Sequence, residues 1–159
     1  MEQIAFDDPQ NAEIADNILQ HLRRSLQLLA SPAQAQLNHF LAGWVVLTDE
    51  MALDFDAWAE RISSYWKLSQ EQLARLTELD EFLNKMSNSS NSDFWSDEAL
   101  SSDPRWEEVR LLAQTALVAC GWPNEIPPPA REEHGMLVDN GSVFIKSHLP
   151  SQLDARDVS

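Results

Sequence analysis

The chain has 159 residues, a length typical of one domain, and 43% of them are hydrophobic, which is enough for a buried core. It carries 26 acidic against 11 basic side chains, a formal net charge of −15. This charge argues against binding to nucleic acid or to an anionic membrane, because both attract clustered Lys and Arg. A single cysteine excludes an internal disulfide framework and a cysteine-rich zinc site.

No segment has the pattern of a targeting signal or a membrane span. The segment formed by the first eight residues carries a net negative charge, whereas a secretory signal begins with a basic region. The longest apolar run covers only residues 41–47, and a spanning helix needs about 20 residues. We therefore expect a cytoplasmic protein without membrane insertion.

Five segments have apolar residues at intervals of three and four, the pattern of an amphipathic helix. These segments are 9–30, 32–48, 54–66, 70–87 and 104–120. Their apolar stripes are wide, as in a globular bundle.

Start and stop signals support these helices. Three capping residues stand directly before a proline, which is favoured at the first helical position because its missing N–H has no partner there. The pairs are Asp8-Pro9, Ser31-Pro32 and Asp103-Pro104. Ser69 with Gln72 fits a capping box, and Gly121 is a typical left-handed stop after the last helix.

Two connecting segments have distinctive compositions. Residues 87–93 are a Ser/Asn-rich connector that cannot bury enough apolar surface to order itself, and a short turn capped by Ser96 follows. Residues 122–129 end in three prolines, which impose extended geometry. They predict a stiff crossover that lies over the bundle or leads away from it.

The periodicity changes after this crossover. Residues 136–139 and 142–145 are apolar runs on either side of Asn140-Gly141, a pair favoured in tight hairpin turns because both positions need positive φ. We expect a β-hairpin here and strands nowhere else.

The predicted fold is all-α, a compact bundle of about five helices with a Pro-rich crossover and a small C-terminal β-hairpin. The helical bundle would cover residues 1–130, the hairpin appendage 131–147 and a disordered tail 148–159.

No catalytic or metal-binding pattern is present in the sequence. With only four glycines the sequence has no glycine-rich phosphate-binding loop, and none of the four histidines lies three or four residues from another. Cys120 falls at the C-terminal end of a predicted helix, where the helix dipole opposes thiolate formation, so its expected role is packing. We therefore predict a protein that is not an enzyme and has no cofactor and no metal.

The acidic stretch 48–60 carries five carboxylates among apolar and aromatic residues. One interpretation is structural, because acids favour the first turn of a helix and the aromatic residues fall on the core stripe. The other is an acidic rim around an apolar groove that receives a basic or amphipathic peptide. A second acidic set would form the other wall: Asp97, Asp103, Glu107 and Glu108.

Two of the six tryptophans, Trp95 and Trp122, fall in irregular segments. They either cover the ends of the bundle or act as aromatic anchors for a partner. The candidate partner-binding residues are Asp49, Glu50, Asp54, Asp56, Trp58, Trp95 and Trp122.

These features favour a non-catalytic protein-binding module, an adaptor or assembly chaperone, that captures a basic or amphipathic segment of another protein. An alternative is an acidic inhibitor, such as an immunity protein or a nucleic-acid mimic, that presents its carboxylates to a basic enzyme. A third hypothesis is a small enzyme whose scattered Asp, Glu and His converge only in the fold. The sequence gives no indication of an oligomeric state.

Overall fold

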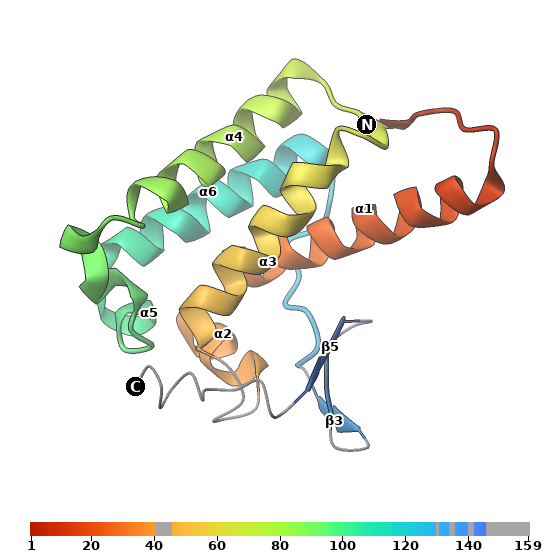
Figure 1. The fold of residues 1–159 in the computed structure, drawn as a ribbon. Coiled ribbons are helices and arrows are strands. Elements are labelled where there is room, and N and C mark those ends of the chain that lie inside the picture. The colour runs from red at the N-terminus through yellow and green to blue at the C-terminus, as the bar shows by residue number, and fades with distance from the viewer. Residues whose placement is uncertain (41–45, 130, 134–135, 140–141, 146–159) are drawn as a thin grey trace.

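The computed structural model describes residues 1–40, 46–129, 131–133, 136–139 and 142–145. Over these residues the protein is mostly helical, with seven helices and two small sheets (Figure 1). The long helices are α1 (Pro9–Ala30), α3 (Leu47–Ile62), α4 (Gln70–Lys85) and α6 (Pro104–Cys120). The short helices are α2 (Ala33–His39), the 3-10 helix η1 (Ser89–Trp95) and α5 (Ala99–Ser102).

The long helices pack in pairs around a shared apolar core. α1 lies against both α3 and α6, and α4 runs along α6 (Figure 1). Leu22 and Leu26 of α1, Phe55 of α3, Leu79 of α4 and Trp106 of α6 are fully buried where these helices meet. The helices α1 and α6 therefore form a central pair, with α3 packed against α1 and α4 packed against α6.

The first and last long helices begin and end where their sequence signals place them. Asp8 accepts the Gln10 backbone N–H at 3.0 Å, and Asp103 accepts the Arg105 backbone N–H at 2.9 Å. Gly121 ends α6 in the left-handed region with φ of 73°. The predicted helices 9–30 and 104–120 are confirmed.

α4 has the predicted capping box. The Ser69 hydroxyl accepts the Gln72 backbone N–H at 3.1 Å, and the Gln72 side chain accepts the Ser69 N–H at 2.9 Å. The prediction that Ser31 caps the second helix is wrong, because no side chain caps the start of α2. The Ser31 hydroxyl instead donates to the Gln27 carbonyl at 2.7 Å, at the end of α1.

The middle of the chain differs from the predicted helices 32–48 and 54–66. α2 ends at His39, because Phe40 is extended with φ −100° and ψ 153°, and α3 begins at Leu47. Apolar residues continue from the end of α2 to the start of α3, so periodicity gave no sign of the break. The acidic stretch is consequently helical throughout.

The Ser/Asn-rich connector forms η1, although its composition predicted no ordered structure. Asn88 caps η1 by accepting the Ser90 backbone N–H at 3.1 Å. Phe94 is completely buried and stacks on Trp106 with ring centroids 4.4 Å apart. The buried Phe94 ring therefore anchors a segment that, apart from Phe94 and Trp95, is polar.

A two-stranded sheet joins the N-terminal segment to the middle of the chain. β1 (Glu2–Gln3) pairs antiparallel with β2 (Trp66–Lys67), and the Trp66 indole N–H donates to the Ala15 carbonyl of α1 at 2.9 Å. The prediction that strands occur only near the C-terminus is wrong. Two-residue strands have no periodicity from which they could be recognised.

Three further strands, β3 (Arg131–Glu133), β4 (Met136–Asp139) and β5 (Ser142–Ile145), form an antiparallel sheet in the order β3-β4-β5. β4 and β5 cover the two expected hairpin strands, whereas β3 was not predicted. The expected Asn140-Gly141 turn and the tail 148–159 lie outside the described residues.

The crossover lies over the bundle at its start, where the Gln27 side-chain amide of α1 donates to the Pro123 carbonyl at 2.9 Å. Farther along the crossover, Pro127 is buried. Of the helices in the described ranges, none combines the length and apolar character needed to cross a membrane.

Candidate functional site: an acidic groove between two helices

A groove runs between α3 and α4. It consists of two adjoining hollows with volumes of about 400 and 350 Å³, which share Asp56 and Asp80. The first hollow extends from this pair to Trp95, and the second extends from it to Leu73. Asp56 and Asp80 therefore mark the middle of the groove.

Each helix contributes one stripe of side chains at intervals of three and four residues, and such residues share a helical face. Each stripe ends just beyond its helix, at Ser63 after α3 and at Ser87 after α4. The α3 stripe consists of Asp49, Ala52, Leu53, Asp56, Ala59, Glu60 and Ser63. The α4 stripe consists of Leu73, Leu76, Thr77, Asp80, Leu83, Asn84 and Ser87. The α3 stripe spans about 20 Å at 1.5 Å per residue. The groove is therefore long and narrow.

The floor of the groove is apolar and its rim is acidic. Phe55 and Leu83 are buried in the first hollow, and Ile62 and Leu76 are buried in the second. Asp49, Asp56 and Glu60 are exposed residues of the α3 lip. A ligand in this groove would thus meet hydrocarbon below and carboxylates at the sides.

Asp56 and Asp80 form a carboxyl pair, each within hydrogen-bonding reach of the other. Partial burial raises the pKa of the Asp80 carboxyl, and the adjacent Asp56 and Glu81 carboxylates raise it further. The Asn84 amide donates to Asp80 at 3.3 Å. Within the described residues, no Lys or Arg pairs with Asp56 or Asp80. Two such carboxyls favour a proton or a cation between them.

Three of the residues predicted from sequence, Asp49, Asp56 and Trp95, line the groove. Glu50 and Trp122 line neither hollow, and Trp122 packs against the apolar core beyond α6. The structure thus assembles part of the predicted set in one place.

Asp54 and Trp58 lie outside the groove stripe and interact with each other. The Trp58 indole N–H donates to the Asp54 carboxylate at 2.9 Å. The Trp58 ring also stacks on His21 of α1, with ring centroids 4.4 Å apart. These contacts give Asp54 and Trp58 a role in joining α3 to α1.

Trp95 lines the first hollow at the end away from Asp56 and Asp80. Its indole N–H donates to the Met86 carbonyl at 2.8 Å, and its own carbonyl accepts the Thr48 hydroxyl at 2.6 Å. The ring is edge-on to Phe94 and Trp106. Trp95 therefore holds the start of α3 beside the end of α4 and shapes the groove.

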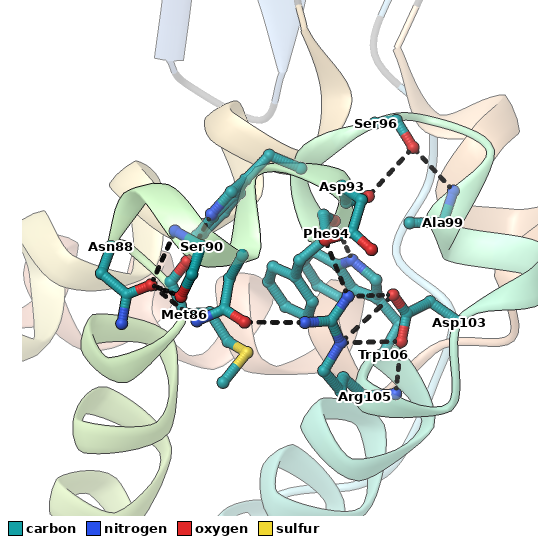
Figure 2. A network of polar contacts seen from close by, with 12 residues as sticks. Met86, Asn88, Ser90, Asp93, Phe94, Ser96, Ala99, Asp103, Arg105 and Trp106 are labelled. Atoms are coloured by element: carbon teal, nitrogen blue, oxygen red, sulfur yellow. Dashed lines mark hydrogen bonds and ion pairs between the residues drawn. The ribbon is translucent and has the colours of Figure 1, made fainter.

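The second acidic set does not form the other wall, because none of its four members lines either hollow. Asp103 caps α6 and pairs with Arg105 at 2.5 Å, which lowers the pKa of the Asp103 carboxyl (Figure 2). Glu107 pairs with Arg110 at 3.1 Å. Asp97 accepts the backbone N–H of Leu47 at the start of α3, and its pKa is raised mainly by burial.

The opposite wall comes from α4, with Asp80 at its centre, which sequence reasoning missed. Asp80 lies in a helix with several other acidic residues, and nothing local distinguishes it from them. Its opposition to Asp56 follows only from the antiparallel packing of α3 and α4.

The residues that line the two hollows include carboxylates, hydroxyls and one amide, but no His or Cys. Among the described residues, no three His, Cys, Asp or Glu side chains lie close enough together to hold a metal ion. Cys120 lies outside both hollows, and burial raises the pKa of its thiol to about 11. The arrangement is suited to binding a group that is cationic at its centre and apolar on either side.

Comparisons with protein-family models, with curated proteins and with solved structures found no match for the chain.

Proposed function

We propose that this protein is a non-catalytic binding module, an adaptor or assembly chaperone, whose α3–α4 groove captures a basic, amphipathic segment of another protein. The observation that carries the proposal is the Asp56–Asp80 carboxyl pair, which lies between two apolar-floored hollows without a basic partner among the described residues. A Lys or Arg from a partner would neutralise both carboxylates at once.

Apolar contacts would supply the rest of the affinity. The groove floor is formed by the apolar side chains of Phe55, Ile62, Leu76 and Leu83, so an apolar partner side chain that lies on it loses contact with water. Charge would act earlier in the encounter, because a net charge of −15 attracts a basic segment over a distance and raises the association rate. We also propose that the protein acts in the cytoplasm, where its single cysteine would stay reduced.

The test uses two double variants that remove the same amount of charge. Asp56→Asn with Asp80→Asn neutralises the carboxyl pair, and Glu13→Gln with Asp16→Asn neutralises two exposed carboxylates on α1. Partners captured from the native host by the parent chain are identified by mass spectrometry, and their binding to each variant is then measured with purified protein.

We expect the groove variant to lose binding and the α1 variant to keep it, while circular dichroism shows that both are folded. Equal weakening by the two variants would favour the acidic inhibitor, since a nucleic-acid mimic uses its carboxylates collectively. Unchanged binding by the groove variant would show that the groove is not the site.

A further inference from the structure

The groove has a near-symmetric layout that defines the shape of its ligand. Asp56 is the midpoint of the α3 stripe, with seven residues on either side to Asp49 and to Ser63. Asp80 is likewise the midpoint of the α4 stripe, between Leu73 and Ser87. The carboxyl pair therefore separates two apolar subsites of similar size.

Both subsites have an exposed leucine at the lip. Leu53 of α3 is 66% exposed beside the first hollow, and Leu73 of α4 is 50% exposed beside the second. The matching positions on each helix, such as Leu76 and Leu83 of α4, are seven residues apart. At 1.5 Å per residue this places the centres of the subsites about 10 Å apart.

An α-helix matches this spacing and a β-strand does not. On a helix, residues i and i+7 lie on one face about 10 Å apart, with i+3 and i+4 between them on the same face. On a strand, residues that share a face are separated by about 7 or 13 Å, because alternate side chains point in opposite directions. Apolar side chains on one face of a strand are therefore spaced either more closely or more widely than the centres of the two subsites.

We infer that the groove takes a single amphipathic helix of a partner protein, with apolar side chains at positions i and i+7 and a Lys or Arg at i+3 or i+4. The inference rests on the proposed function and specifies its ligand. The apolar anchors occupy the first and second hollows, and the cation lies between Asp56 and Asp80. The occupant would act as a third helix laid along α3 and α4, a known mode of peptide recognition.

The probe is a display library of 15-residue, alanine-rich helical peptides, randomised at positions i to i+7 and selected on the full-length protein. A peptide of this length spans about 22 Å as a helix, close to the length of the groove. We expect the selected peptides to converge on a base at i+3 or i+4 between apolar residues at i and i+7. Their affinity should fall about tenfold or more on the Asp56→Asn/Asp80→Asn variant.

Single substitutions then test the register. Leu53→Ala should weaken the selection for an apolar peptide residue at the anchor in the first hollow. Leu73→Ala should weaken the same selection at the anchor in the second hollow. Leu111→Ala removes an exposed leucine of α6 that lines neither hollow, and it should leave the selection unchanged. Circular dichroism of each variant checks that the fold is kept.

The other outcomes separate the two proposals. Peptides that depend on Asp56 and Asp80 but lack this spacing would overturn the helical ligand and leave the groove as the site. No selected peptides, or peptides indifferent to the carboxyl pair, would overturn both proposals. Self-association in analytical ultracentrifugation that Leu53→Ala and Leu73→Ala abolish would show that a second copy of this chain occupies the groove instead.

Discussion

The carboxyl groups of Asp56 and Asp80 lie close together, and this proximity affects the stability of the folded protein. The folded-state pKa of Asp80 is raised, so the folded protein binds this proton more tightly than the unfolded chain does. The contribution of Asp80 to the free energy of unfolding is therefore greatest below its unfolded-state pKa of 3.8. This contribution is lost as the pH rises through the raised pKa of the folded state.

We predict that Asp80→Asn removes this pH dependence and stabilises the protein by a few tenths of a kcal/mol at pH 7, because Asp80 is only partly buried. Urea unfolding at several pH values between 4 and 7 measures the effect. Asp16→Asn is the control, since Asp16 is exposed and lies on α1. Parallel pH profiles for the parent and Asp80→Asn would contradict the prediction.

A second residue-scale prediction concerns Cys120. Burial raises the pKa of its thiol to about 11, so very little thiolate is present at neutral pH. We expect slow reaction with a thiol reagent in the native state and fast reaction after unfolding in urea. The native rate should also rise with pH towards 11. Rapid native labelling at pH 7 would show an activated thiol and would reopen the enzyme hypothesis.

At the scale of elements, η1 depends on a few long-range contacts. Arg105 of α6 pairs with Asp93 at 3.2 Å, donates to the Asn91 side chain at 2.9 Å and lies 5.4 Å from the Phe94 ring centroid. Figure 2 shows this network around the buried Phe94. These contacts position Trp95 at the end of the groove.

We predict that Phe94→Ala destabilises the protein by about 3 kcal/mol or more, the usual cost of deleting a fully buried phenyl ring. Amide hydrogen exchange should increase first in residues 88–96, because this segment has no other fully buried large side chain. Phe6→Ala provides the control, since Phe6 is only partly buried near the N-terminus. Destabilisation without faster local exchange would mean that η1 is held by its polar contacts alone.

The sequence predicted those elements whose signals are local. Asp8, Asp103 and Gly121 determine where α1 and α6 begin or end, and each acts on the backbone within a few residues. The break between α2 and α3 has no such signal, because the apolar run is continuous. η1 depends on the burial of Phe94 beneath a distant helix, which no composition reveals.

The same distinction applies to the site. The acidic stretch 48–60 identified Asp49 and Asp56, because their charge and their neighbours are adjacent in sequence. Asp80 and Leu73 became part of the site only through the packing of α4 beside α3. Asp54, which belongs to the same acidic stretch, lines neither hollow, and its carboxylate accepts the Trp58 indole N–H one turn farther along α3.

At the scale of the whole molecule, net charge and the groove should act on different steps of binding. The charge of −15 acts at a distance and is screened by salt, so it affects mainly the association rate. Contacts inside the groove exist only in the complex, so they affect mainly the dissociation rate. The two double variants separate these effects, because each changes the net charge from −15 to −13.

We predict that Glu13→Gln/Asp16→Asn slows association slightly and leaves dissociation unchanged, whereas Asp56→Asn/Asp80→Asn speeds dissociation about tenfold or more. Surface plasmon resonance with the identified partner, at 0.05 and 0.5 M salt, measures both rates. For a groove that buries apolar anchors, added salt should slow association and change dissociation little. If both variants alter only association and high salt abolishes binding, the carboxylates act collectively, and the protein is an acidic inhibitor of a basic partner.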